Sequence, residues 1–267
     1  MQKRILSLLL SVLLIVASCK TVPLTGRHQL NLIPESKMTQ MAVSQYRSFL
    51  TSNPVVTNTS NKNVEMVKRV GSRIAQAVTT YLTNHGYGNS VDDYHWQFNL
   101  VKSDEANAWC MPGGKVVVYT GLLPITQNET ALAVVLGHEI AHAVARHGNE
   151  RMSQQLIAQG LQVAGSVALS KEPKKRNIFL QAFGVGGSLG LKAFGRRDEL
   201  EADQLGLIFM AMAGYDPRQA IPFWKRMASM SGSNNVPTLL SSHPSDAKRI
   251  RQIKRLLPKA MKYYKPH

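Results

Sequence analysis

The sequence predicts an α+β fold that is mostly helical, with one small antiparallel sheet. Apolar residues recur at helical spacing through most of the 267 residues. Between residues 94 and 119 the spacing changes to two, as expected of strands. Helices therefore come first, a short sheet follows, and further helices complete the chain, an order typical of α+β domains.

The composition is that of one globular domain with short appendages. Hydrophobic residues make up 44% of the chain and charged residues 18%, which excludes a disordered protein. The net charge of +16 suits an anionic membrane surface. Nucleic acid is not expected as a partner, because no run of Lys and Arg is interleaved with aromatic residues.

The first eighteen residues have the pattern of a secretory signal peptide. A basic start precedes an apolar run over residues 5–16, and the small residues Ala17 and Ser18 follow. The run is shorter than the roughly 20 residues of a membrane-spanning helix. Cys19 comes next, so the segment resembles the site at which bacterial lipoproteins are cleaved and lipidated.

This pattern predicts three parts: a signal peptide over residues 1–18, a lipid-anchored extended lead-in over 19–34, and a folded domain over 35–267. By resemblance, the expected location is the bacterial cell envelope, at the outer membrane and facing the periplasm. With Cys19 lipidated, Cys110 has no partner in the chain, so no disulfide is expected.

Helices flank the predicted strands. Helical spacing predicts helices over residues 35–50 and 64–82. Alternation predicts a strand from Trp96 to Leu100, and β-branched residues predict another over 116–119. A long helix is expected from the capping box of Thr126 and Glu129 to about His147, where Gly148 would end it. Further helices are expected over residues 150–170, 177–194, 197–213, 216–230 and 244–257. The Gly- and Ala-rich stretches 156–170 and 178–195 are predicted to be buried or membrane-skimming helices, because they are short and separated by charged residues.

The first chemical motif lies inside the long helix. His138 and His142 are four residues apart in the pattern H-E-x-x-H, so both imidazoles lie on one side of the helix. Glu139 is offset from His138 by about 100° and would flank a metal as the general base for an attacking water. Two His and a carboxylate also suit iron(II), but the helical pattern favours one Zn²⁺ per chain.

A catalytic zinc site needs a third protein ligand and an open position. Glu199 and Asp203 are spaced four residues apart on a predicted helix, so they share a face. Glu199 is the expected ligand, and Asp203 would accept the other ring N–H of a ligand His. Glu201 is expected to point elsewhere, and His147 to be turned away from the metal by about 180°.

These residues resemble a known family. His138-Glu139-x-x-His142 followed by Glu199-x-x-x-Asp203 is similar to the gluzincin metallopeptidases of the CAAX prenyl protease and HtpX type, which have mitochondrial and bacterial periplasmic relatives. The resemblance covers most of residues 22–255 and implies a zincin-like zinc metallopeptidase domain. The chain is most similar to the short periplasmic lipoprotein members, so no C-terminal repeat domain is expected.

The resemblance adds candidate residues near the metal. Ser242-His243-Pro244 with Arg249 resembles a family loop whose His lies beside the site. His243 is a candidate catalytic residue that either stabilises the oxyanion or fills the fourth zinc position in a latent state. Arg249 is a candidate substrate-binding residue.

An edge strand is the other candidate for substrate binding. An unpaired strand edge accepts an extended peptide through backbone hydrogen bonds. The segment between the two predicted strands would supply that edge, and simple packing in the sheet explains it nearly as well. The candidate residues are Asn107, Ala108, Trp109 and Cys110.

The site and the resemblance together imply a zinc-dependent endopeptidase. By resemblance, its partners would be unfolded or misassembled envelope proteins, with the membrane reached through the N-terminal lipid. The alternative is a lipid-anchored chaperone or binding module with a latent metal site. A structural lipoprotein with vestigial metal binding is a third interpretation.

Overall fold

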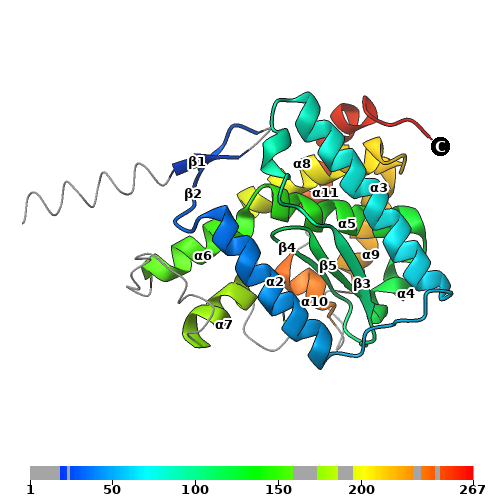
Figure 1. Ribbon diagram of the computed structural model, residues 1–267. Helices are drawn as coiled ribbons and strands as arrows, with labels where there is room; N and C mark the ends of the chain where they lie inside the picture. Colours follow the sequence, from blue (N-terminus) through cyan, green and yellow to red (C-terminus); the bar gives the residue numbers. More distant parts are fainter. Residues whose placement is uncertain are drawn as a thin grey trace, which may run out of the picture.

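The computed structural model describes six stretches of the chain: residues 19–22, 25–158, 173–185, 195–230, 236–243 and 247–266. The predicted signal peptide and much of the Gly- and Ala-rich stretches 156–170 and 178–195 lie outside these residues. Within them, helices surround one three-stranded sheet, which confirms the predicted α+β class (Figure 1). In the part of the chain that the structure describes, the helices are too short or too polar to cross a bilayer.

The N-terminal lead-in forms a hairpin. Strand β1 (Cys19–Thr21) pairs antiparallel with β2 (His28–Leu30). Gly26 lies in the connecting turn with φ 71°, a left-handed conformation that glycine adopts without steric cost.

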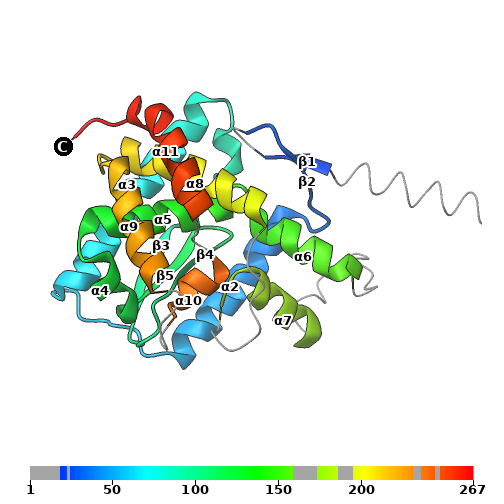
Figure 2. The same ribbon diagram turned by 180° about the vertical axis from the view of Figure 1, so that it is seen from behind.

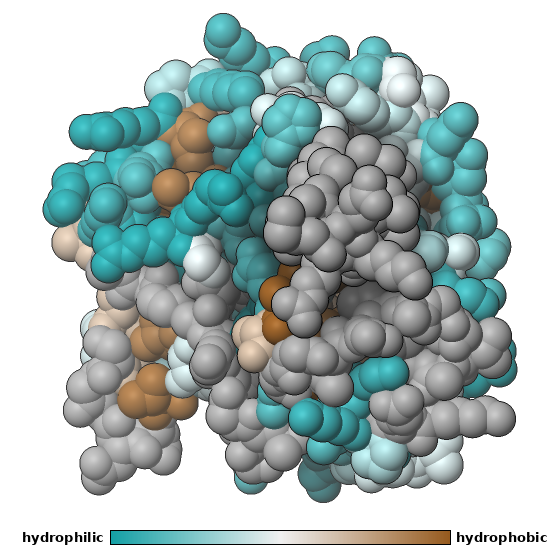
Figure 3. All heavy atoms as spheres, turned by 90° about the vertical axis from the view of Figure 1, so that its left-hand side faces the viewer, coloured by the Kyte–Doolittle hydropathy of each residue, from teal (hydrophilic) through white to brown (hydrophobic). Residues whose placement is uncertain are grey.

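In the side view of Figure 3, hydrophilic residues cover much of the upper part of the coloured surface.

Two long helices follow with bounds within two residues of those predicted. Helix α2 covers Glu35–Ser52, and α3 covers Lys62–Asn84. The Asn61 side chain begins α3 by accepting a hydrogen bond from the backbone N–H of Asn63. Each helix then covers one face of the sheet.

The sheet is mixed rather than wholly antiparallel as predicted. Its strands are β3 (Gln97–Val101), β4 (Ala108–Met111) and β5 (Lys115–Tyr119), in the order β3-β5-β4. β5 is antiparallel to β4, to which a turn at Gly113 and Gly114 joins it, and parallel to β3. The parallel pair arises because β5, whose residues are all buried, inserts between the two strands that precede it.

Successive residues of the sheet contribute to two different cores, because side chains alternate between its faces. One face packs with α3 and α5 and carries Ala108 and Cys110. The other packs with α2 and carries Trp109, whose ring contacts Tyr46 and Phe49 edge-on. The alternation therefore directs Ala108 and Cys110 toward the helix that carries the H-E-x-x-H motif.

That helix, α5 (Glu129–Val144), begins and ends at other residues than predicted. Its N-cap is Asn128, whose side chain accepts from the N–H of Ala131 at 2.9 Å, whereas Thr126 ends the short helix α4 (Leu123–Thr126). The helix stops before His147 because Arg146 adopts a left-handed φ of 59°. A new helix, α6 (His147–Ala158), then begins.

The remaining helices follow the predicted order. Figure 2 shows the last of them, in yellow to red, on the face of the molecule opposite α2. The short α10 was not predicted, and the predicted helix 216–230 begins with a 3₁₀ turn. These helices are α7 (Pro173–Ala182), α8 (Arg196–Met212), α9 (Ala220–Ser229), α10 (Thr238–Ser242) and α11 (Ala247–Met261).

Helices α5 and α8 approach each other closely at two glycines. A Cβ atom on Gly137 would lie 2.8 Å from the carbonyl oxygen of Gly206. A Cβ on Gly206 would lie 2.9 Å from the backbone nitrogen of His138. Only glycine permits this separation, and the close approach brings the acidic side chains of α8 next to the histidines of α5.

Candidate metal centre

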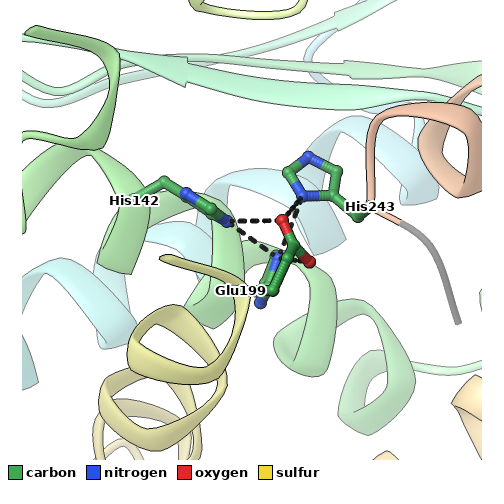
Figure 4. A group of neighbouring side chains, drawn as sticks. His142, Glu199 and His243 are labelled. Carbon is green, nitrogen blue, oxygen red and sulfur yellow. Dashed lines mark hydrogen bonds and ion pairs between the residues drawn. The ribbon is translucent and has the colours of Figure 1, made fainter. Parts of the chain in front are cut away.

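Four buried side chains with metal-binding atoms converge at this helix crossing. His138 and His142 come from α5, Glu199 comes from α8, and His243 follows the end of α10. Their ligand atoms all lie within 4.8 Å of one another. Figure 4 shows His142, Glu199 and His243 pointing toward one another from three different elements.

The spacing of these atoms fits a tetrahedral zinc ion. With bonds of 2.0–2.1 Å, the ligand atoms of four-coordinate zinc lie about 3.3 Å apart. Nε2 of His138 and Nε2 of His142 are 3.1 Å apart. The carboxylate of Glu199 lies 3.4 Å from Nε2 of His142 and 3.5 Å from Nε2 of His138. The donor set of two imidazoles and one carboxylate is also one that zinc enzymes use.

His243 occupies the fourth corner of this arrangement. Its Nδ1 lies 3.2 Å from Nε2 of His138 and 2.7 Å from Oε1 of Glu199. Its Nε2 lies 3.4 Å from Oε1 of Glu139. The side chain is therefore within reach of both the metal position and the predicted general base.

Asp203 supports the first ligand histidine. Its Oδ1 lies 3.0 Å from Nδ1 of His138. Since a carboxylate accepts hydrogen bonds, this contact assigns a proton to Nδ1, and a metal that replaces the Nε2 proton would bind His138 through Nε2.

Arg249 lies behind the ligands, although the sequence analysis expected it among the substrate-binding residues. Its side chain is buried, donates to both oxygens of Asp203 and lies 3.0 Å from Oε2 of Glu199. The guanidinium also stacks on Trp224, 3.5 Å from the ring centroid. In the described residues Arg249 therefore neutralises the carboxylates of Asp203 and Glu199.

His147 contradicts the expectation that it is turned away from the site, whereas Glu201, as expected, is not among the side chains that converge on the metal position. Nδ1 of His147 lies 2.8 Å from Nδ1 of His142, and its Nε2 lies 3.0 Å from Oε2 of Glu201. The expected 180° rotation assumed one continuous helix, and the break at Arg146 removes that premise. The end of the apolar run at Ala145 was the available sequence signal.

Glu139 faces a small enclosed cavity beside the metal position. Its side chain is buried, and its Oε1 makes no hydrogen bond to any described residue. Ala108 and Cys110 of β4 line the same cavity, together with His142 and His243. The cavity has room for about one water molecule. A buried carboxylate oxygen that makes no hydrogen bond within the described part of the chain, with Nε2 of His243 3.4 Å away, suits a base that accepts a proton from water.

Of the four candidate edge-strand residues, Trp109 takes part in other packing, whereas Asn107 lines the cavity together with Ala108 and Cys110. The Trp109 ring belongs to the core on the far face of the sheet, as described above. The Asn107 side chain bonds locally to the backbone N–H of Ala108. Burial raises the pKa of the Cys110 thiol well above its usual value, which keeps it protonated and unreactive.

Burial and neighbouring charges set the ionisation of the site. Burial lowers the pKa of His142 well below its usual value, so the imidazole is neutral and able to bind metal. Burial opposes ionisation of Glu199, but His243, Arg249 and His138 lower its pKa well below the usual range. Burial raises the pKa of Glu139, partly offset by the adjacent His243 and His138.

Fold and site together define a zinc metallopeptidase of the H-E-x-x-H class. The family described as Peptidase family M48 matches residues 61–257, and the chain belongs to this family. The predicted resemblance to the gluzincin peptidases and the predicted zinc cofactor are thereby confirmed.

Curated relatives agree with this assignment. The chain is 36% identical over 173 residues to the mitochondrial metalloendopeptidase OMA1 of Schizosaccharomyces pombe, covering 64% of this chain and 50% of that protein. It is 28% identical over 250 residues to the mitochondrial metalloendopeptidase OMA1 of Bos taurus, covering 90% and 46%. It is 30% identical over 183 residues to the beta-barrel assembly-enhancing protease of Escherichia coli, covering 65% and 37%. The chain thus spans half or less of each relative.

The predicted location at a bacterial outer membrane, facing the periplasm, is wrong. The relatives with 35–36% identity are mitochondrial metalloendopeptidases of eukaryotes, and the bacterial proteases match at 30–32%. A basic start, an apolar run and a cysteine form a short local pattern. Such a pattern does not by itself specify a compartment, because several targeting routes use basic and apolar N-terminal segments. The expected origin of the substrates in the envelope loses its basis with the location.

Proposed function

We propose that this chain is an endopeptidase that hydrolyses peptide bonds in protein substrates. The convergence of His138, His142 and Glu199 beside the buried carboxylate of Glu139 carries this proposal. When bound, Zn²⁺ supplies the Lewis acidity that acidifies water and polarises a carbonyl. Glu139 accepts a proton from the attacking water and delivers it to the leaving amine.

The edge of β4 would hold the substrate as an added strand. Among the described strands β4 has β5 as its only neighbour, so its other edge is unpaired. The carbonyl of Asn107 accepts from Tyr119 on β5, so by alternation the carbonyl of Ala108 and the backbone groups of Cys110 point to the open edge, while the N–H of Ala108 already donates to the Asn107 side chain. The same two residues line the cavity beside Glu139, which aligns a bound peptide with the general base.

The proposed substrates are unfolded or misassembled proteins. A strand edge binds backbone groups of an extended chain, and folded proteins have already paired most of theirs. Sequence preference would then depend on the few side chains that reach the cavity. Unfolded casein is therefore a suitable first substrate, and the same casein cross-linked in a compact form is its control.

The membrane tether at Cys19 is a separate proposal. It is supported by the apolar run over residues 5–16 and the small residues before the cysteine. Mass spectrometry of the N-terminal peptide from membrane fractions tests it. A lipid mass on Cys19, absent after Cys19→Ser, supports the tether, whereas an unmodified Cys19 or an intact residue 1–18 segment contradicts it.

Glu139→Gln tests the catalytic role. The amide keeps the shape of the side chain but cannot accept a proton, so casein cleavage should fall by about 10²-fold or more. Zinc content, measured on the same samples, should stay at one ion per chain because Glu139 is not among the converging metal-binding side chains. Cleavage that persists in the variant or in chelator would contradict the proposal.

One observation favours a second candidate function, a chaperone or binding module with a latent site. His243 fills the fourth corner of the metal site, and the cavity has room for about one water. This closure of the site is the observation that favours holding client proteins over cutting them.

His243→Ala distinguishes the two roles proposed for this histidine. If His243 closes a latent site, the variant opens the fourth position and casein cleavage rises. If His243 stabilises the oxyanion, cleavage falls by about 10²-fold, as when one such donor is removed. If the Glu139→Gln protein still binds clients and fully substitutes for the parent protein in cells, the chaperone role is favoured.

A further inference from the structure

A chain of hydrogen bonds joins the N-terminal hairpin to a ligand of the metal site. Nδ1 of His142 lies 2.8 Å from Nδ1 of His147, and Nε2 of His147 lies 3.0 Å from Oε2 of Glu201. The Glu201 carboxylate also accepts from the hydroxyl of Thr25 and, at 2.6 Å, from Nε of Arg27. The turn of the hairpin thus lies three hydrogen bonds from the metal position.

The partners in this chain, together with a bound metal, assign each proton. The carboxylate of Glu201 can only accept, so Nε2 of His147 carries a hydrogen and donates it. A metal bound at Nε2 of His142 requires the ring hydrogen at Nδ1, and that hydrogen is then donated to Nδ1 of His147. Nε2 of His142 is consequently left with a lone pair that points toward Glu199 and His138. This is the tautomer that a metal requires.

The hydrogen-bonded series is buried at His147, and it reaches an open groove at its hairpin end, where Thr25, Arg27 and Glu201 line the groove. His147 is fully buried, Glu201 is 8% exposed, and the side chain of Arg27 is 13% exposed. Burial opposes ionisation of Glu201, but hydrogen bonds from His147, Thr25 and Arg27 lower its pKa to about 2. Because His147 is fully buried, its contacts with His142 and Glu201 fix geometry more firmly than surface ion pairs do.

The hairpin is also anchored from the side of α6. Arg27 spans two carboxylates, since its NH1 group donates to Glu150 at 2.8 Å while Nε donates to Glu201. Glu150 belongs to α6, the helix that His147 begins, and Glu201 belongs to α8. Arg27 therefore fixes the position of His147 and of its acceptor in relation to each other.

We propose that the hairpin is a positioning element of the zinc site, in which Thr25 and Arg27 hold Glu201, and Glu201 orients the ligand His142 through His147. The two ligand histidines are then supported in different ways. His138 has its own carboxylate in Asp203, whereas His142 depends on a segment more than a hundred residues earlier in the chain. The inference rests on the proposed zinc site and does not depend on which substrates are cut.

His147→Phe is the direct test, because phenylalanine keeps a ring in the buried space but has no hydrogen bond for His142. Glu201 retains Thr25 and Arg27 as partners in this variant. Loss of the support behind a metal ligand typically weakens metal binding by about 10–100-fold. Zinc release from the full chain into a chromogenic chelator should therefore speed up by about that factor. A smaller increase, about threefold or more, is expected for Arg27→Gln.

Two controls separate this role from general stabilisation. Arg218→Gln removes the ion pair between the exposed Arg218 and Asp216, in the 3₁₀ turn before α9. This change should leave zinc release unchanged. The double variant, His147→Phe with Arg27→Gln, should release zinc no faster than His147→Phe alone. The reason is that Arg27 acts on His142 only through His147. Urea unfolding of each variant shows whether the fold is retained.

The results distinguish a failure of the hairpin's positioning role from a failure of the proposed zinc site. A parent protein that binds no zinc contradicts the proposed function and not the positioning role of the hairpin. If the parent protein binds zinc and the His147→Phe and Arg27→Gln variants release zinc at the parental rate, the positioning role of the hairpin is overturned. Additive effects in the double variant also overturn it, since independent action would mean that the hairpin does not work through His147.

Discussion

The Arg249 guanidinium is the charge on which the buried carboxylates of the site depend. It contacts Glu199 and both oxygens of Asp203, and it stacks on Trp224. Two carboxylates in a water-poor interior repel each other and lose hydration. Arg249 offsets both effects, and therefore keeps the ligand Glu199 and the support Asp203 ionised in the metal-free protein.

Replacing Arg249 by methionine should destabilise the metal-free protein by about 3–5 kcal/mol, because the change leaves buried negative charge without its partner. Methionine fills much of the same volume, so lost packing is kept small. Urea unfolding in chelator measures the free energy. The control is Arg69→Met, which removes an ion pair with Glu129 at the surface and should have little effect. Equal losses in the two variants would show that charge burial is not what Arg249 provides.

Spacing along one helix was enough to place the side chains of the H-E-x-x-H motif together. His138, Glu139 and His142 lie within five residues, so helical geometry alone aims the imidazoles at one point. It failed for His147, because a single left-handed residue at Arg146 redirects the chain. Nothing in the polar character of an arginine indicates that its φ will be positive.

At the scale of elements, the crossing of α5 and α8 determines the separation of the metal ligands. Gly137 directly precedes His138, and Gly206 is one helical turn from Asp203. Each glycine occupies space that a Cβ from the other helix would need. The two helices therefore approach backbone to backbone, which is what lets Glu199 reach the histidines.

Gly206→Ala should push α8 away from α5, since its Cβ would meet backbone atoms that cannot rotate aside. Overpacking of this kind costs about 1–3 kcal/mol. Zinc affinity, measured by chelator competition, should fall together with stability. The matched control is Gly195→Ala on the same helix, where the nearest atom to a Cβ is a side-chain oxygen of Asp198 at 3.4 Å. A Gly206→Ala protein with parental zinc affinity would contradict this view of the crossing.

At the scale of the whole molecule, the metal position joins three separate parts of the fold. The ligands come from α5, from α8 and from the residue after α10, and the hairpin supports them from outside. An ion bound there crosslinks segments that are distant in the chain. Metal binding should therefore stabilise the complete domain and not a single helix.

Zinc removal should lower the thermal unfolding midpoint. At a free zinc concentration of 100 times Kd, binding stabilises the folded state by about 2.7 kcal/mol. For a chain of this size the loss corresponds to about 5–10 °C. Differential scanning calorimetry with and without chelator measures it, and added Zn²⁺ should restore the midpoint whereas Mg²⁺ should not. An unchanged midpoint would mean that the ligands do not hold zinc in the folded protein.

The sequence by itself determined the α+β class, the bounds of α2 and α3 to within two residues, and the placing of His138 and His142 on one face of one helix. These depend on local periodicity, which the chain carries in every short window. Only the tertiary structure decided that β5 pairs with β3, that His147 supports His142, and that Thr25 and Arg27 reach Glu201. Those contacts join residues far apart in the chain, and their formation depends on a helix break and a glycine crossing that hydrophobic spacing does not encode.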